Sequence, residues 1–151
     1  MAAKKVHIRV VTPTGVLVDD HVDLAIMRCI TGDLGVMGGH ESRSGVLDYG
    51  VLRLVKGSKE RQVAVHGGLV KILKAEPTQL TILTDAAERS EKIDLERAKA
   101  KLSRSQSVIS EKADDESAVS HAKVSQKKAL VRIEVASVSA VSDAEWNEEG
   151  G

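Results

Sequence analysis

Residues 79–98, QLTILTDAAERSEKIDLERA, decide the fold because the spacing of the apolar side chains changes within them. Leu80 and Ile82 alternate with polar residues, which is typical of a strand with one buried face. After Asp94, apolar or small residues recur every three or four positions, at Leu95, Ala98 and Leu102. That spacing is typical of an amphipathic helix. The stretch therefore predicts a β-structured half before it and a helical half after it.

The N-terminal half repeats the period of two residues. In residues 6–10 (VHIRV) apolar residues alternate with polar ones, and Pro13, Thr14 and Gly15 then supply a turn. Further strand candidates are residues 16–18, 21–26, 51–56, 62–65, 69–73 and 79–83. Short strands separated by turns predict an antiparallel sandwich or barrel, which we assign to residues 1–88.

Residues 32–50 break this pattern because they contain six glycines. They predict a long loop with one short strand at most. Glycine-rich loops can cradle a phosphate, but the Gly-Lys-Ser/Thr sequence of the Walker motif does not follow here. Glycines that permit tight turns are the better interpretation.

The C-terminal half predicts a hairpin of two helices in residues 89–136. The first helix begins at Asp94, whose carboxylate can cap the free N–H groups of the first turn. After a polar connection at residues 112–116, a second stripe follows at Ala118, Ala122, Ala129, Ile133 and Ala136. A short connection makes the two helices antiparallel. Because alanine buries little apolar surface, we expect the hairpin to need the β-domain or a partner protein for stability.

Residues 137–151 follow the second helix and are rich in serine and acidic residues. This composition predicts a disordered tail. Trp146 is then an isolated aromatic residue within it.

Composition excludes several classes of protein. Lys plus Arg and Asp plus Glu both total 22, and this zero net charge argues against a general nucleic-acid binder. Tyr49 and Trp146 are the only aromatic residues, which leaves no platform for stacking bases. No apolar run reaches the roughly 18–20 residues of a membrane-spanning helix, and no signal segment follows the N-terminus. The single cysteine, Cys29, cannot form an internal disulfide and suits a reducing compartment.

His40 is a candidate for chemistry, with Glu41 or Asp48 as its acid–base partner in a small enzyme. No further residue is spaced to orient the imidazole or to complete a metal site. A histidine that fixes a loop by hydrogen bonds is the simpler interpretation.

The second helix carries two pairs of basic residues spaced four apart, Lys123 with Lys127 and Lys128 with Arg132. Each pair shares one face of the helix. Such faces are usually solvated, and the alternative is a docking strip for an acidic partner surface.

Several short motifs follow one another in a specific order between residues 5 and 136. They are VVTPTGV at 10–16, GDLGV at 32–36, GH at 39–40, GVL at 50–52, VHGG at 65–68, LTIL at 80–83, AE at 87–88, IDLERA at 93–98 and ALVRIEVA at 129–136. Each motif is weak alone. Their joint order closely resembles the epsilon subunit of bacterial F-type ATP synthases, whose mitochondrial counterpart is the delta subunit.

The resemblance implies a ten-stranded antiparallel β-sandwich followed by an antiparallel two-helix hairpin. It implies a non-catalytic central-stalk (rotor) subunit of a proton-translocating F-type ATP synthase, with no catalytic residues, no metal and no required cofactor. The sandwich would bind the gamma subunit and the membrane c-ring. The hairpin would extend toward the alpha and beta catalytic subunits and inhibit ATP hydrolysis. The chain would then lie peripherally on the cytoplasmic face of the bacterial plasma membrane, with His40, Lys123 and Lys127 as partner-contact candidates.

Some bacterial members of this family bind ATP while the hairpin is folded down, which makes an ATP sensor the alternative function. The resemblance assigns this site to Glu88, Ile93, Asp94, Arg97, Ala98, Arg104, Lys128 and Arg132. Lys128 stands where the family has arginine, so a single ammonium replaces a two-pronged guanidinium. Residues 37–40 read Met-Gly-Gly-His where Leu-Pro-Gly-His is usual in the family, so the c-ring contact is expected to differ.

Overall fold

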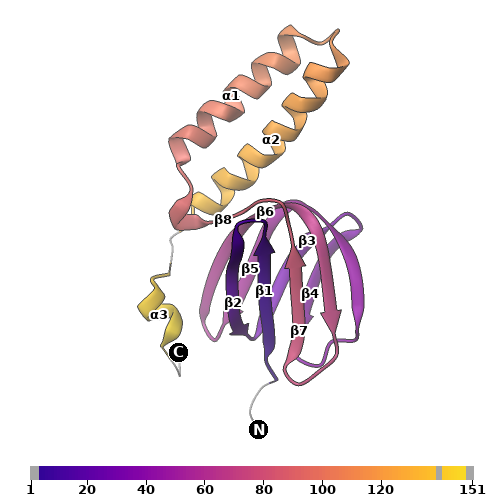
Figure 1. Ribbon diagram of the computed structural model, residues 1–151. Coiled ribbons are helices and arrows are strands. Elements are labelled where there is room, and N and C mark those ends of the chain that lie inside the picture. The colour runs from indigo at the N-terminus through magenta and orange to yellow at the C-terminus, as the bar shows by residue number, and fades with distance from the viewer. Residues whose placement is uncertain (1–3, 139–140, 149–151) are drawn as a thin grey trace.

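The computed structural model describes residues 4–138 and 141–148 of the chain. Its strands are β1 (Val6–Thr12), β2 (Gly15–Val22), β3 (Leu24–Cys29), β4 (Gly32–Met37), β5 (Arg43–Lys56), β6 (Lys59–Leu73), β7 (Thr78–Leu83) and β8 (Ala87–Arg89). Its helices are the 3-10 helix η1 (Ser90–Lys92) and the α-helices α1 (Leu95–Glu111), α2 (Glu116–Ala136) and α3 (Asp143–Asn147). The hairpin of α1 and α2 stands on one end of the β-domain, and α3 lies beside it (Figure 1).

The β-domain is a folded sheet around an aliphatic core. The strand order is β2-β1-β7-β6-β5-β3-β4, and β8 pairs with β6. Burial alternates along the strands, as in β1, so that one set of side chains faces inward. The largest side chains that are completely enclosed are aliphatic and include Ile8, Leu52, Leu54, Ile72, Leu80 and Ile82. Burial of this surface is the main force that holds the domain together.

The expected β-sandwich followed by an antiparallel helical hairpin is confirmed. The described part of the chain has eight strands where ten were expected, because β5 and β6 continue as single strands of 14 and 15 residues. Six of the seven strand pairings are antiparallel, and β1 with β7 is parallel. β1 lies between β2 and β7, a contact between distant parts of the chain that a local pattern does not reveal.

The glycine-rich segment is not the long loop that its composition predicted. It forms β4 and the start of β5, and only residues 38–42 separate these two strands. Its glycines serve close approach: a Cβ at Gly50 would lie 2.7 Å from the Cβ of Arg28, and one at Gly38 would overlap Lys4. Composition does not distinguish a glycine needed for a turn from one needed for close packing of strands.

The hairpin has the predicted helices, and its apolar contact with the β-domain is small. Asp94 caps α1, since its carboxylate accepts the backbone N–H of Arg97 at 3.1 Å. Near the end of α2, Val131 and Val135 pack with Ala64 of β6. The cluster is completed by Tyr49, Val51 and Ile93. This one small cluster joins the apolar side of the hairpin to the sandwich.

The tail differs from the prediction of disorder over residues 141–148. Asp143–Asn147 form α3, and Trp146 is 2 % exposed against the β-domain rather than isolated. Ser142 and Glu145 form a capping box at the start of this helix. The prediction failed because serine and acidic residues are common in disordered segments but also form helix caps and ion pairs.

Candidate functional site

A cavity lies where the β-domain meets the hairpin. Its volume is about 240 Å³, and it is lined by Glu88, Lys92, Ile93, Asp94, Arg97, Ala98, Lys101 and Arg132. The lining residues come from β8, η1, the two residues that join η1 to α1, the first turns of α1 and the end of α2. Residues that are far apart in the sequence therefore meet at one junction.

Local structure places each of these side chains. β8 pairs with β6, which fixes Glu88 opposite Ala64. The Asp94 cap starts α1 beside the cavity, and Arg97 and Lys101 follow on one face because they are four residues apart. The antiparallel return of α2 brings Arg132 from the other side.

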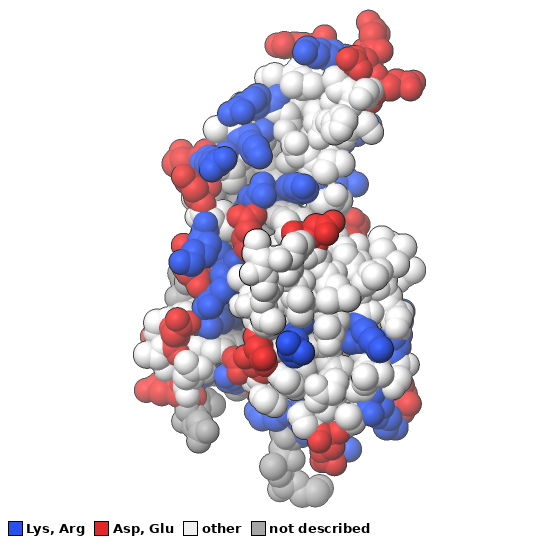
Figure 2. All heavy atoms as spheres, in the orientation of Figure 1, with Lys and Arg blue, Asp and Glu red and all other residues white. Residues whose placement is uncertain are grey.

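The charges around the cavity favour an anion. Four cationic side chains (Lys92, Arg97, Lys101, Arg132) and two carboxylates (Glu88, Asp94) line it, so the local formal charge is 4 − 2 = +2. Lys and Arg side chains also gather along one edge of the hairpin down to its junction with the sandwich (Figure 2). Such a field attracts a polyanion such as a nucleotide phosphate.

Glu88 is the centre of a polar cluster at one wall of this cavity. Its Oε1 accepts from Nε of Arg132 at 2.5 Å and lies 3.1 Å from Nε2 of His66. Partial burial acts to raise the pKa of Glu88, but the bonds to Arg132 and His66 outweigh it and lower that pKa. Burial also lowers the pKa of His66, which keeps the imidazole neutral at neutral pH. The cluster therefore ties α2 to two strands of the sandwich through one ionised carboxylate.

The structure gathers six of the eight residues that the family resemblance assigned to an ATP site. Glu88, Ile93, Asp94, Arg97, Ala98 and Arg132 line the cavity. Arg104 lies farther along α1, in a groove that α1 and α2 share near Ser105 and Ala122. Lys128 is half-buried on α2 near His66 and does not line the cavity.

Sequence reasoning missed two cavity residues, Lys92 and Lys101. Lys101 follows Arg97 by four positions, a spacing that puts both on one face of a helix and that was available in the sequence. Lys92 belongs to a single 3-10 turn whose direction no local pattern indicates.

Of the three residues predicted to contact partner subunits, Lys123 and Lys127 lie one turn apart on α2, His40 lies in the turn after β4, and none of them lines the cavity. Nδ1 of His40 is 2.7 Å from the backbone oxygen of Glu41, a local contact within the turn after β4. Lys123 and Lys127 are exposed on α2, and the Lys127 ammonium lies 5.9 Å from the ring centroid of Tyr49.

A second candidate site is a continuous apolar strip on the outer surface of the sandwich. Leu69 of β6 lies opposite both Val46 of β5 and Leu83 of β7, and paired residues share a face of the sheet. Leu83 pairs with Val11, and Val11 pairs with Val16. Ile30 follows β3, and its backbone N–H donates to the carbonyl oxygen of Val46 at 3.0 Å, which places Ile30 beside Val46. We call Ile30, Val46, Leu69, Leu83, Val11 and Val16 the apolar band.

The apolar band is open to solvent in the isolated chain. Five of its six side chains are 45–64 % exposed, and Val11 is half-buried. Single exposed apolar residues are ordinary, but a row that crosses six neighbouring segments is typical of a protein–protein contact. The sequence analysis missed the band because its members sit at outward positions of different strands, and only the strand register aligns them. Among the described residues, no helix has the length and apolar character required to span a bilayer.

Two family models together match the chain from residue 5 to residue 137. The model for the β-sandwich domain of the ATP synthase delta/epsilon chain matches residues 5–90. The model for the long alpha-helix domain of the same chain matches residues 91–137. The remaining C-terminal residues, which include α3, lie beyond both matches.

Curated relatives carry the same family name. The ATP synthase epsilon chain of Alkalihalophilus pseudofirmus is 39 % identical over 110 residues, which cover 73 % of this chain and 80 % of the relative. That of Bacillus pumilus is 36 % identical over 133 residues, which cover 88 % and 98 %. A solved chain in the mitochondrial ATP synthase of Euglena gracilis superposes with a TM-score of 0.75 at 21 % identity, covering 90 % of this chain and 82 % of its own. That structural likeness concerns the fold.

Proposed function

Because the chain belongs to the delta/epsilon chain family of ATP synthases, we propose that it is a non-catalytic central-stalk subunit of a proton-translocating F-type ATP synthase. In this role the sandwich binds the gamma subunit and the c-ring, and the hairpin faces the alpha and beta catalytic subunits. The chain then lies at the cytoplasmic face of the bacterial plasma membrane, held there through the complex.

The observation that carries this proposal is the apolar band. Monomeric proteins rarely expose a contiguous row of apolar side chains such as Ile30, Val46, Leu69 and Leu83. Burial of such a row against a partner contributes free energy at roughly 25 cal/mol per Å² of apolar surface. We assign the band to the gamma subunit, and its test opens the Discussion.

A catalytic role for His40 receives no support from its surroundings. One ring nitrogen of His40 is engaged by the neighbouring backbone oxygen rather than by a carboxylate. The Glu41 carboxylate instead pairs with Lys74 at 2.6 Å. The proposal therefore assigns the chain a function in binding and regulation.

The hairpin is the regulatory part of the proposal. It is held to the sandwich by one small apolar cluster and by the Arg132–Glu88 pair. Contacts of this size allow a second arrangement with the hairpin extended, and the ratio of the two states then sets the activity of the complex.

Deleting residues 94–151 is expected to raise ATP hydrolysis by the assembled catalytic head several-fold. The deletion removes the helices that would enter the head but leaves the apolar band in place. Steady-state ATPase assays on heads reconstituted with either form measure the effect. The proposal of inhibition fails if both forms occupy the head equally and hydrolysis is the same.

A second candidate function, ATP sensing, is favoured by the cavity at the junction. Its excess of cations suits a polyphosphate, and Arg132 is the residue most directly placed to exchange Glu88 for a phosphate oxygen. Since Arg132 belongs to α2 and Glu88 to β8, a ligand in this cavity would contact both halves of the junction. Bound ATP would therefore stabilise the folded-down hairpin by mass action.

Arg97→Ala is expected to weaken ATP binding on the order of 10-fold, because one charge-assisted contact contributes about 1.5–3 kcal/mol. Isothermal titration calorimetry with ATP, with and without Mg²⁺, provides the measurement. Arg104→Ala is the matched control, since it removes the same charge from the same helix but lies outside the cavity. Equal ATP affinity in the parent chain and Arg97→Ala would remove this candidate function.

A further inference from the structure

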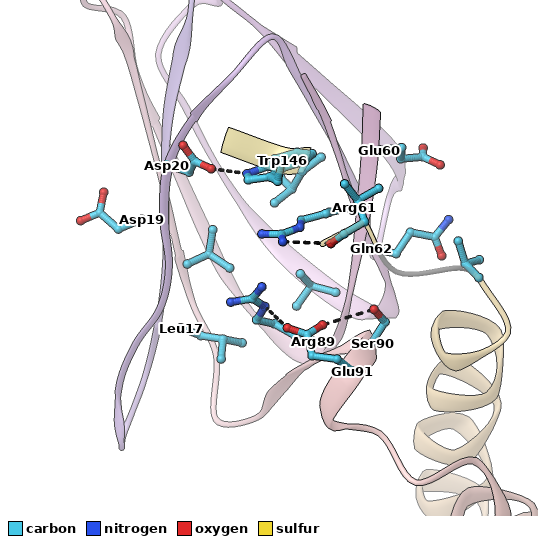
Figure 3. A pocket seen from close by; sticks show the side chains of 15 residues that line it. Leu17, Asp19, Asp20, Glu60, Arg61, Gln62, Arg89, Ser90, Glu91 and Trp146 are labelled. Atoms are coloured by element: carbon cyan, nitrogen blue, oxygen red, sulfur yellow. Dashed lines mark hydrogen bonds and ion pairs between the residues drawn. The ribbon is translucent and has the colours of Figure 1, made fainter. Parts of the chain in front are cut away.

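Residues 141–148, which follow the hairpin, dock on the β-domain, although they lie outside the part of the chain that the family models match. We call residues 141–148 the C-terminal segment. Its Trp146 packs into the aliphatic core of the sandwich, with Val141, Leu17 and Val18 at the margin. A groove remains beside it, with a volume of about 190 Å³ and walls from β2, β5, β6 and β8. Figure 3 shows Trp146 directed into this groove toward Asp20.

Trp146 is held by polar contacts as well as by burial. Its indole N–H donates to a carboxylate oxygen of Asp20. The Lys56 ammonium and the Arg61 guanidinium lie 4.7 and 4.9 Å from the centroid of the indole ring. These distances are within the range of cation–π attraction, which is stronger for Trp than for other aromatic residues. The β-domain thus offers the indole both apolar contact and favourable charge.

The backbone and acidic side chains of the C-terminal segment meet a row of cations. Arg61 donates to Asp143 at 2.5 Å and to the Val141 carbonyl at 3.0 Å, and Arg89 donates to Asp143 at 3.0 Å. Lys59 donates to the carbonyl oxygens of Glu145 and Glu148 at 2.5 and 2.7 Å. The hydrogen bonds to Arg61 and Arg89 also lower the pKa of Asp143, so its carboxylate stays charged near neutral pH. Together with Lys56, which lies over the Trp146 ring, four basic side chains therefore face one acidic segment.

Chain length couples this docking to the position of the hairpin. α2 ends at Ala136 and α3 begins at Asp143, so six residues connect them. Such a connection spans at most roughly 25 Å. α2 alone, with 21 residues, is about 30 Å long at 1.5 Å per residue. If α2 leaves the sandwich and follows α1 away from it, the docked segment has to leave its groove.

We propose that the groove between β2, β5 and β6 is a docking site for the acidic, tryptophan-containing C-terminal segment, and that the docked segment is a latch that holds the hairpin folded onto the sandwich. The docking stands on the contacts of Trp146 and Asp143 alone. The latch rests additionally on the hairpin movement of the proposed function. The latch adds a regulatory element that the two matched domains do not contain.

Quenching of tryptophan fluorescence in the full chain tests the docking, because Trp146 is the only tryptophan. The parent chain is expected to be poorly quenched by acrylamide. Asp143→Lys places a cation beside Arg61 and Arg89 and is expected to raise the quenching constant several-fold. Asp114→Lys makes the same change in the exposed turn between α1 and α2 and is expected to leave quenching unchanged. A parent chain that is quenched as readily as Asp143→Lys overturns the docking.

Hydrogen exchange of the isolated full chain tests the latch. Trp146→Ala is expected to accelerate amide exchange over residues 128–136 on the order of 10-fold, while strands β1 and β7 keep their protection. Asn147→Ala, at the exposed neighbouring position, serves as the control. Unchanged exchange in α2 despite an undocked segment overturns the latch. Neither measurement includes the ATP synthase, so failure here is distinct from failure of the proposed role in the stalk.

Discussion

Leu69→Asp is expected to weaken binding of the gamma subunit on the order of 100-fold, which corresponds to about 3 kcal/mol. Leu69 lies in the interior of the apolar band, with Val46 and Leu83 directly beside it on the neighbouring strands. A carboxylate at this position would lose water on association without gaining an ionic partner. Surface plasmon resonance with the two purified subunits measures the change in dissociation constant.

Ser58→Asp is the control for this substitution. It adds the same charge in the turn at the opposite end of β6. Because the Leu69 side chain is 55 % exposed in the free chain, Leu69→Asp is expected to leave thermal unfolding close to that of the parent. Equal affinity of the parent, Leu69→Asp and Ser58→Asp for the gamma subunit would contradict the assignment of the apolar band.

Gly68→Ala is expected to lower the free energy of unfolding by roughly 3–5 kcal/mol. The φ angle of Gly68 is 130°, a value that residues other than glycine rarely adopt. An added Cβ would also overlap the carbonyl oxygen of Leu83. That oxygen belongs to the backbone of the neighbouring strand, so relief of the overlap requires β6 and β7 to separate. Equilibrium unfolding in urea, monitored by far-ultraviolet circular dichroism, measures the loss.

Gly32→Ala separates backbone strain from the overlap. Gly32 has a φ angle of 124°, close to that of Gly68, but apart from its own chain neighbours no atom lies within 4 Å of the added Cβ. The strain alone is expected to lower stability by about 1–3 kcal/mol. If the two substitutions lower the free energy of unfolding equally, the close approach of Leu83 to Gly68 does not limit this sheet.

The period change in residues 79–98 was sufficient to predict a β-domain followed by helices. It succeeded because periods of 2 and 3.6 reflect local geometry that tertiary contacts seldom override in long segments. The Asp94 cap was predictable for the same reason, since a cap is a contact between neighbours in sequence. The parallel contact of β1 with β7 was not predictable, because it joins segments about 70 positions apart.

The glycine-rich segment and Trp146 show where composition misleads. Six glycines in residues 32–50 suggested a loop, yet Gly38 and Gly50 are needed because Lys4, just before β1, and Arg28 of β3 pass close by. The acidic, serine-rich tail suggested disorder, yet Trp146 is buried against the β-domain with Lys56 and Arg61 over its ring. Both outcomes depend on the surface that the rest of the fold presents.

The candidate site was partly predictable, because the family resemblance identified its motif residues in the sequence. The antiparallel hairpin then brings most of these residues to one cavity. Glu88 and Arg132 lie 44 positions apart and meet at 2.5 Å only because α2 returns antiparallel to α1. Arg104 does not line the cavity, because seven residues along a helix advance it about 10 Å from Arg97. The apolar band required the register of β5, β6 and β7, which the sequence does not specify.

Affinity purification of the tagged full chain from membranes tests the central proposal most directly. The proposal predicts that the gamma subunit, the c-ring and the alpha and beta subunits co-purify with the parent chain, and that Leu69→Asp loses them. The purified chain alone is expected to hydrolyse no ATP. Recovery of the parent chain without a gamma subunit, or turnover by the isolated chain, would contradict its role as a non-catalytic stalk subunit.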